Sequence, residues 1–502
     1  MAEKKSDIVS IVIPAYNAEK YIEETVASAL KSSYPFIEIV IVNDGSTDTT
    51  QLIIDSIVRK HPQIKSFQQK NSGVSVARNT GISHATGNYI LPLDADDLIS
   101  SDYIEQAVEI LNNNDTVKLV YGLGEFIGDR KGKWNLRPFS RRLLARKNML
   151  YISGIFRKSD FDQTDGFCAE IKGPEDWDFW ISLLKRNGDV VRIPSVCLFY
   201  RVHANSKRLA NKNKKKEAIE ILNKRHKAFF YRELGGKLHY RRTWSRLFNF
   251  FLQLIRPERI VVNKEYENLD EFVYNLPALF ENGGKIIHSL RNTIKTFEVS
   301  GYKIVVKSFH TPNLLNRFIY GNFRPSKAHR SYDYALKLIR MGIGTPIPIG
   351  YYEQKCVFLF SKSYYACLQS ECNNKFSDLI NNFSFPDRVE ILKAIGRFTA
   401  ILHEQGVCHR DYSAGNILFQ KNDKTITIEI IDLNRIDFGD VDLVKGCKNF
   451  ERLNIDAQSL EIMANQYAIT REFEPKVCID NILKMRWKKH KEISNISTEQ
   501  PK

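Results

Sequence analysis

Three aspartates, Asp94, Asp96 and Asp97, stand within four positions and follow a short apolar run, residues 89–93. The run contains an aromatic and a β-branched residue, so it predicts a buried strand. Alternate residues of an extended stretch point the same way, so Asp94 and Asp96 can face one ligand. Two carboxylates at the carboxyl end of a strand can hold Mg²⁺ or Mn²⁺, with phosphate oxygens as the remaining ligands. A solvated acidic turn is the alternative that the tripeptide alone leaves open.

A second set of polar residues with defined spacing lies in the other half of the chain. His409, Arg410 and Asp411 are consecutive, and Asn416 follows five positions after the aspartate. This spacing matches the HRDxxxxN catalytic loop of the protein-kinase-like fold, in which Asp accepts a hydroxyl proton and Asn holds a metal ion. Lys307, at the end of an apolar stretch, stands where the lysine that binds the phosphates of ATP is expected.

Two aspartates compete for the remaining metal position of this half. Asp437 begins the letters DFG, whereas Asp432 directly ends the predicted strand ITIEII. A strand end gives a fixed position that can face Asn416, so the sequence favours Asp432 as the metal ligand. The acid that pairs with Lys307 is predicted to be Asp333, because the predicted helix 326–341 contains no Glu.

Strands and helices alternate around the first acidic cluster, in a β-α-β-α order with acids at successive strand ends. Six pieces occur in sequence: IPAYN (13–17), VNDGSTD (42–48), ARNTGI (77–82), LDADD (93–97), GPEDWDFW (173–180) and YRVHANS (200–206). Together they resemble the family 2 glycosyltransferases over roughly residues 8–206. The resemblance implies a nucleotide-sugar-binding α/β domain of the GT-A type.

The same resemblance implies a set of donor contacts. Tyr16 would stack on the base of the nucleotide-sugar, Asp44 would hydrogen-bond to it, and Asp94 would reach the ribose or the metal. Asp96 would hold the cation against the diphosphate, where it offsets charge on the leaving group. His203 resembles a late element that approaches the metal and diphosphate, although a histidine after an aromatic strand can also be purely structural.

The general base of the transferase half is assigned by resemblance as well. Asp176 would deprotonate the acceptor hydroxyl, and the adjacent Glu175 is its rival. The family is inverting, which implies a single displacement without a covalent nucleophile. A polysaccharide synthase is the alternative class, and the absence of a QxxRW motif and of an apolar membrane span favours a non-processive transferase.

The run IDLNR (431–435), together with HRDYSAGNILF and VVKSF, resembles the lipopolysaccharide core kinases, the Kdo/heptose kinase family, over about residues 280–460. The resemblance implies an α+β protein-kinase-like fold, ATP as co-substrate and a sugar hydroxyl of the lipid A–core region as acceptor. The chain lacks a GxGxxG loop and an APE motif, which argues against an ordinary protein kinase. A glycan-binding pseudokinase is the alternative, and the intact motif residues argue against it.

The segment between the halves carries most of the chain's net charge of +16. Residues 207–259 contain sixteen Lys and Arg against four Glu. Within them, 241–259 predict a basic amphipathic helix that either lies on an anionic membrane surface or docks on a neighbouring domain. No nucleic-acid recognition motif accompanies the charge, so no nucleic-acid partner is expected.

Length and composition fit this division. The 502 residues are 43% hydrophobic, and no apolar run approaches the ~20 residues that span a bilayer. The eight scattered cysteines form no CxxC pair, which favours a reducing cytoplasm, with peripheral attachment to the inner face of the cytoplasmic membrane as a further option. We expect a glycosyltransferase domain at 1–208, a helical linker at 209–262, a kinase-like domain at 263–490 and a polar tail at 491–502. The joint function predicted is a bifunctional enzyme of lipopolysaccharide biosynthesis.

Overall fold

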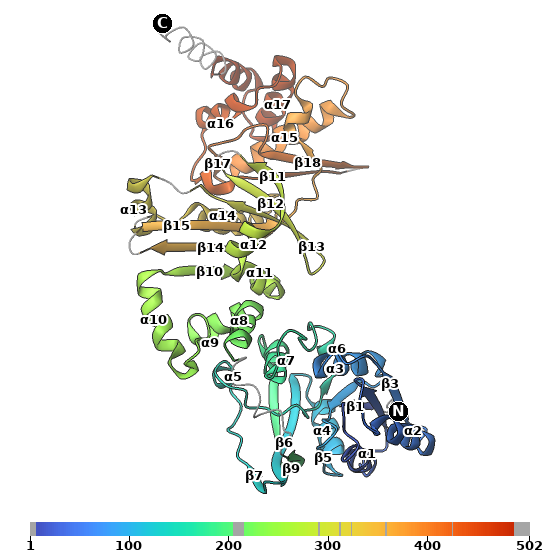
Figure 1. The fold of residues 1–502 in the computed structure, drawn as a ribbon. Coiled ribbons are helices and arrows are strands. Elements are labelled where there is room, and N and C mark those ends of the chain that lie inside the picture. Colours follow the sequence, from blue (N-terminus) through green and yellow to red (C-terminus); the bar gives the residue numbers. More distant parts are fainter. Residues whose placement is uncertain are drawn as a thin grey trace. The chain divides into compact units, whose positions relative to one another are not determined.

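The computed structural model describes residues 7–203, 215–289, 292–310, 313–322, 324–356, 359–423 and 425–485. The predicted tail 491–502 and the last letters of YRVHANS lie outside this range. The chain forms two compact units, Met1–Phe251 and Leu252–Lys502 (Figure 1). Within the described ranges, no helix combines the length and the hydropathy needed to cross a bilayer.

The first unit is built on a five-stranded sheet in which four strands are parallel and the edge strand β8 is antiparallel. The strands in spatial order are β3 (Ile64–Gln68), β2 (Ile37–Asn43), β1 (Val9–Ala15), β4 (Tyr89–Pro92) and β8 (Phe156–Arg157). The helices between them are α1 (Ile22–Leu30), α2 (Thr50–Lys60) and α3 (Val74–His84). Strands β1 and β4 are buried throughout, as expected for parallel strands covered on both faces.

A second sheet of four strands completes the first unit. In spatial order its strands are β5 (Leu98–Ile99), β9 (Asp189–Val202), β6 (Val117–Gly128) and β7 (Gly132–Trp134). The helices α4 (Tyr103–Asn113) and α7 (Glu175–Leu184) pack into the same core, with Trp180 and Phe179 fully buried. The end of β4, the end of β9 and the start of α7 lie close together, as ion pairs among residues at these ends and on α3 show.

The predicted linker 209–262 differs from the structure in its first part. Helices α8 (Lys215–Arg225) and α9 (Lys227–Leu234) bury Leu222, Phe229 and Phe230 in the core of the first unit. The high density of Lys and Arg in this segment led the sequence to be interpreted as a linker. Long basic side chains on the outer face of a helix do not prevent the opposite, apolar face from packing.

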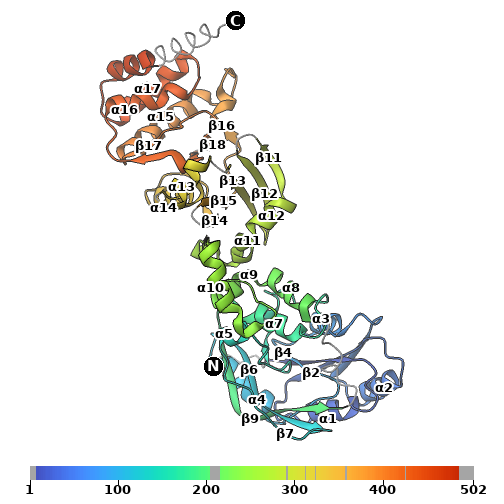
Figure 2. The ribbon, with the colours of Figure 1, turned by 60° about the vertical axis from the view of Figure 1, so that its left-hand side comes forward.

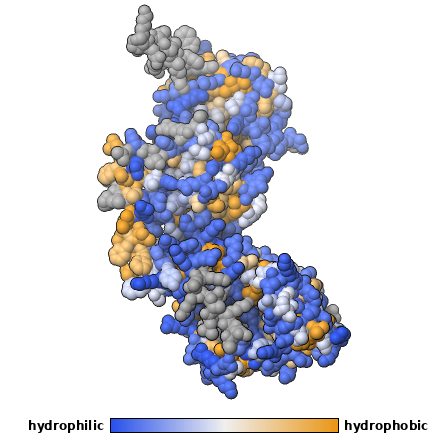
Figure 3. Space-filling view, in the orientation of Figure 1, coloured by the Kyte–Doolittle hydropathy of each residue, from blue (hydrophilic) through white to orange (hydrophobic). Residues whose placement is uncertain are grey.

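Helix α10 (Ser245–Ile255) buries polar side chains and exposes its apolar side chains. Its buried side chains are the polar Ser245 and Asn249, and Asn249 donates to the backbone carbonyls of Leu234 and Lys237. Its apolar face is exposed: Phe250 is 59% and Leu254 62% accessible. Figure 3 shows these residues as a hydrophobic area at the position of α10 in Figure 1.

The second unit begins with an antiparallel six-stranded sheet. In spatial order its strands are β10 (Glu258–Val262), β14 (Pro348–Cys356), β15 (Leu359–Leu368), β13 (Tyr302–Ser308), β12 (Thr293–Val299) and β11 (Lys285–Ser289). Helix α14 (Lys327–Arg340) packs against β14 and β15 (Figure 2). The predicted strand pair with its Ser-Gly turn corresponds to β12 and β13.

A mainly helical part follows in the same unit. It contains α15 (Arg388–Glu404), α16 (Leu443–Asn449), α17 (Ala457–Thr470) and the short paired strands β17 (Val407–His409), β20 (Ile436–Phe438), β18 (Ile417–Asn422) and β19 (Thr425–Ile430). The long α15 and α17 pack together and bury Ile395 and Met463. The predicted fold classes, α/β for the first half and α+β protein-kinase-like for the second, are confirmed.

Candidate active sites

The carboxyl ends of β1, β2 and β4 bring the predicted donor-binding residues to one edge of the first sheet. The register aligns Ala15 with Asn43, so Tyr16 and Asp44 follow neighbouring strand ends. Tyr16 is 48% exposed, which leaves its ring accessible for the predicted stacking on a base.

Asp44 is buried and already has local partners. Its carboxylate accepts hydrogen bonds from the backbone N–H groups of Ser72 (2.8 Å) and Gly73 (2.9 Å) and from Gln69 Nε2 (2.8 Å). Gly45 allows the close approach of this loop: its φ is +72°, and a Cβ there would lie 2.8 Å from the backbone nitrogen of Asn71. Asp44 therefore positions the loop before α3, and its contact with a base stays a prediction.

The acidic cluster after β4 has three different sets of partners. Asp94 Oδ1 lies 2.6 Å from Arg78 Nη2, and Asp96 Oδ2 lies 3.0 Å from His203 Nε2. Asp97 is buried and accepts a hydrogen bond from the backbone N–H of Arg201 (2.8 Å). Burial raises the pKa of Asp96, and the negative charge of Asp94 raises it further.

The surroundings of Asp96 fit a divalent cation. The negative charge of Asp94 adds to the cost of ionising Asp96, and a bound cation would offset that cost. In the described part of the chain, no group of three or more His, Cys, Asp or Glu is arranged to hold a metal. Diphosphate oxygens of a nucleotide-sugar could complete the ligands of a cation at Asp96.

Arg78 is a central residue of this site to which the sequence analysis gave no role. It is carried by α3 within ARNTGI and is 3% exposed. It lies between two acids, with Nη2 at Asp94 and Nη1 3.8 Å from Glu175 Oε1. The available signal was its position: Arg78 shares the buried face of α3 with Ala77 and Ile82.

Asp176 lies in the first turn of α7 and is partly buried. Asn148 Nδ2 donates to its Oδ2 (2.7 Å), and the backbone N–H of Trp177 donates to its Oδ1 (2.8 Å). Burial, followed by the charge of Glu175, raises the pKa of Asp176 to about 7, while Arg78 acts in the opposite direction. A carboxyl group with such a pKa can accept a proton at neutral pH, which is the property of a general base.

In the second unit, Lys307 and Asp432 form an ion pair, a contact that the sequence motifs did not predict. Lys307 Nζ, near the end of β13, is 2.7 Å from Asp432 Oδ1. Asp333 does not take the predicted position beside Lys307. Its carboxylate pairs instead with His329 Nε2 (2.9 Å), one turn earlier on α14. An acid four residues after a histidine on an exposed helical face reaches that histidine more readily than the sheet.

The catalytic-loop residues are held by backbone and side-chain bonds. Asn416 Nδ2 donates to the carbonyl of Asp411 (2.9 Å), which closes the loop. The backbone N–H of Ile431 donates to the carbonyl of Asn416 (3.0 Å), so Asn416 lies beside the segment that carries Asp432. Burial lowers the pKa of His409, whose Nε2 lies 3.0 Å from the carbonyl of Ile431.

Asp411 and the two competing aspartates have separate cationic partners. Asp411 lies 3.2 Å from Arg435 Nη1 and 2.8 Å from Arg452 Nη1. Asp432 has a left-handed backbone (φ 59°) and pairs with Lys307, whereas Asp437 lies in β20 and pairs with Arg410. This geometry favours Asp432 over the literal DFG aspartate, and the metal role of Asp432 stays a prediction.

Comparison with known proteins covers both halves. The sequence matches Glycosyl transferase family 2 over residues 10–169 and the Lipopolysaccharide kinase (Kdo/WaaP) family over residues 305–470. A chondroitin synthase of Pasteurella multocida (strain Pm70) is 25% identical over 75% of this chain and 42% of its own length. A hyaluronan synthase of Pasteurella multocida is 27% identical over 62% of this chain and 30% of its own.

Solved structures show more distant likeness. TarS 1–349 of S. aureus in complex with UDP-GlcNAc is 17% identical, with a TM-score of 0.38, over 60% of this chain and 96% of that one. WaaP in complex with acyl carrier protein is 16% identical, with a TM-score of 0.35, over 47% of this chain and 98% of that one. The chain spans less than half the length of the two curated synthases. It carries a glycosyl transferase family 2 domain in its first half and a lipopolysaccharide kinase (Kdo/WaaP) family domain in its second half.

Proposed function

We propose that the chain is a bifunctional enzyme that transfers a sugar from a nucleotide-sugar to a glycan and phosphorylates a sugar hydroxyl of the lipid A–core region with ATP. The Lys307–Asp432 pair at 2.7 Å, next to a closed Asp411–Asn416 loop, is the observation that carries the kinase half. A pseudokinase would not require its phosphate-binding lysine and its metal-binding aspartate, here Lys307 and Asp432, to lie side by side.

In the transferase half, the acceptor hydroxyl would lose its proton to Asp176 as it attacks the donor sugar. Burial raises the pKa of Asp176 to about 7, and Asn148 fixes the orientation of its carboxylate. Mg²⁺ or Mn²⁺ held by Asp96, with His203 beside it, would offset charge on the leaving diphosphate. The reaction would be a single displacement with inversion at the sugar.

In the kinase half, Lys307 would bind the phosphates of ATP and Asp411 would accept the proton of the sugar hydroxyl. Arg435 and Arg452 hold the carboxylate of Asp411 in position from two sides. Asn416 and Asp432 would hold Mg²⁺, whose charge offsets that of the transferred phosphoryl group.

The exposed apolar face of α10 supports attachment to an anionic membrane surface from the cytoplasmic side. The helix is fixed to residues 234–239 through polar bonds, so its apolar residues are not needed for that contact. Arg241, Arg246 and Arg256 flank the face and are exposed. Such a combination of apolar area and basic flanks is typical of helices that lie in a membrane interface.

A second candidate concerns the glycan. Because two relatives are named chondroitin synthase and hyaluronan synthase, a polysaccharide of that kind is the alternative acceptor of the transferase half. Mass spectrometry of lipid A–core from cells lacking the gene distinguishes a lipid A–core acceptor from a polysaccharide acceptor. Loss of both a sugar and a phosphate from the core is expected. An unchanged core together with a shortened extracellular polysaccharide would contradict the core assignment.

A further inference from the structure

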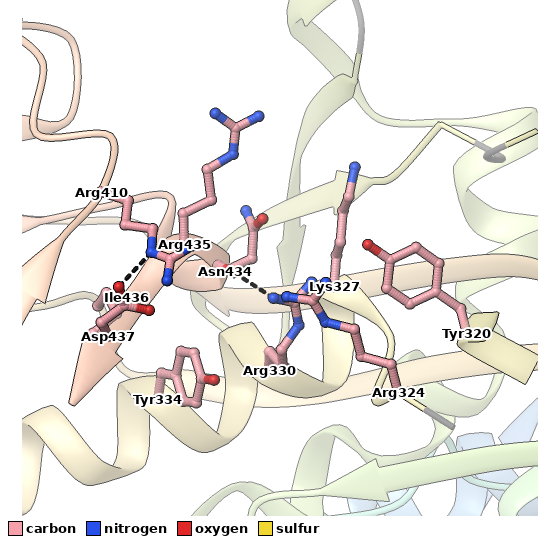
Figure 4. A pocket seen from close by; sticks show the side chains of 10 residues that line it. All are labelled: Tyr320, Arg324, Lys327, Arg330, Tyr334, Arg410, Asn434, Arg435, Ile436 and Asp437. Carbon is pink, nitrogen blue, oxygen red and sulfur yellow. Dashed lines mark hydrogen bonds and ion pairs between the residues drawn. The ribbon is translucent and has the colours of Figure 1, made fainter. Parts of the chain in front are cut away.

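A cavity of about 400 Å³ in the second unit lies beside the catalytic loop and is not used by the proposed reaction (Figure 4). It is lined by Tyr320, Arg324, Lys327, Arg330, Tyr334, Arg410, Asn434, Arg435, Ile436 and Asp437. These residues come from the end of α13 (Leu314–Asn322), the connection to α14 that contains Arg324, the first turns of α14, the catalytic loop and the segment after Asp432.

The lining is strongly basic: five of the ten side chains are cationic and one is acidic. The acid, Asp437, is engaged by Arg410, so it does not balance the cations on the α14 side. Figure 4 shows the ends of Arg324 and Arg330 lying close together. Burial lowers the pKa of Arg330, and the neighbouring charge of Arg324 lowers it further, which is the signature of crowded like charges.

The cavity shares residues with the kinase machinery. Arg435 lines it and also lies 3.2 Å from Asp411, and Asn434 lines it while donating to Asp432. Arg330 Nη1 donates to the backbone carbonyl of Asn434 (2.9 Å), which ties α14 to this segment. A ligand in the cavity would therefore lie next to the proposed base.

We propose that this basic pocket binds an anionic group, a phosphate or a carboxylate, carried by the sugar acceptor of the kinase half. The inference rests on the proposed kinase function. Guanidinium groups bind carboxylate and phosphate oxygens through paired hydrogen bonds, and a cavity with several of them selects an anion over a neutral sugar. The N-terminal end of α14, where Lys327 stands, adds partial positive charge at the same place.

Direct binding tests the pocket independently of catalysis. Methyl phosphate is titrated into the full-length protein by calorimetry, with saturating Mg-ADP present to fill the nucleotide site. Wild type should bind saturably, and Arg324→Gln combined with Lys327→Gln should weaken binding at least about tenfold. Arg340→Gln, at the exposed last turn of α14, is the matched control and should bind as wild type. Equal binding by the double variant, or no saturable binding by wild type, would overturn the proposal.

A kinetic arm identifies the source of the anion. With a core oligosaccharide as acceptor, the double variant should raise KM about tenfold and leave kcat unchanged. With the carboxylates of the acceptor methyl-esterified and its phosphates removed, wild type and variant should have the same KM. Methyl phosphate should compete with the acceptor. If it stimulates phosphorylation instead, the pocket is a regulatory site for free phosphate and the acceptor assignment is wrong. If the chain has no kinase activity at all, the calorimetric result still reports on the pocket.

Discussion

The two candidate sites organise their acids in different ways. In the transferase site one buried guanidinium, Arg78, lies between Asp94 and Glu175 and also lowers the pKa of Asp176. Among the described residues of the kinase site no cation is shared between acids: Asp432 pairs with Lys307, and Asp411 pairs with Arg435 and Arg452. A shared buried cation couples folding to the site, whereas separate exposed pairs allow one acid to change without the others.

The largest expected effect is on metal use in the first unit. Asp96→Ala should reduce sugar transfer about a thousandfold, which corresponds to about 4 kcal/mol, because the leaving diphosphate loses its cation. Phosphoryl transfer should persist in the same preparation. Sugar transfer is measured with a panel of radiolabelled nucleotide-sugars, with and without EDTA. Full sugar transfer in the presence of EDTA, or by the variant, would show that the transferase does not need a metal at Asp96.

The shared cation itself can be removed. Arg78→Met should lower the free energy of unfolding of the first unit by about 3–5 kcal/mol, because it leaves the partly buried Asp94 and Glu175 without their buried counter-charge. Lys307→Met, which removes a partly exposed cation, should cost about 1 kcal/mol or less. Denaturant titration followed by hydrogen exchange assigns each loss to its unit. Similar losses for the two variants would contradict the comparison.

The pH dependence of sugar transfer sharpens the role of Asp176. A base acts only when it is ionised, so the rate should fall as the pH drops through about 7. The amide of Asn148 stabilises the ionised carboxylate. Asn148→Ala should therefore move the profile about one unit toward alkaline pH, since one such hydrogen bond is worth about 1.4 kcal/mol. The phosphorylation rate of the same protein is the internal control and should keep its profile.

The smallest expected effect concerns α10. Arg241→Glu combined with Arg246→Glu should reduce flotation with anionic liposomes several-fold, and added salt should reduce it further, because exposed charges are screened over about 10 Å at 0.1 M. Arg59→Glu with Lys60→Glu, on exposed positions of α2, is the control. Arg242 is left unchanged, because its guanidinium lies 5.5 Å from the ring centroid of the buried Trp177. Equal flotation of both variants, or none of wild type, favours docking of α10 on protein.

Much of this architecture could be predicted because strand ends fix positions in space. The run 89–93 with its acids, and the strand that ends before Asp432, lie where periodicity placed them. The sequence did not reveal the packing of α8 and α9, because charge counts conceal a buried stripe.

The ion-pair partners of charged residues could not be predicted from the sequence either. The helix pattern alone points to Asp333, yet its partner is decided by which side chain the folded helix brings near, and that side chain is His329. Arg78 was visible in ARNTGI, but its role depends on Asp94 and Glu175, which lie far from it in sequence. Such contacts are set by tertiary packing, which short-range patterns do not encode.

The most direct test of the two-activity account follows both reactions in one sample. Purified wild type and the variants Asp432→Asn, Asp411→Asn and Asp437→Asn are given a panel of nucleotide-sugars, γ-labelled ATP and a core oligosaccharide. Asp432→Asn and Asp411→Asn should lose nearly all phosphoryl transfer, Asp437→Asn should keep a substantial fraction, and all three should transfer sugar as wild type does. If Asp437→Asn is inactive and Asp432→Asn is active, the strand-end assignment is wrong. If no variant alters phosphorylation, the second unit is not a kinase of this type.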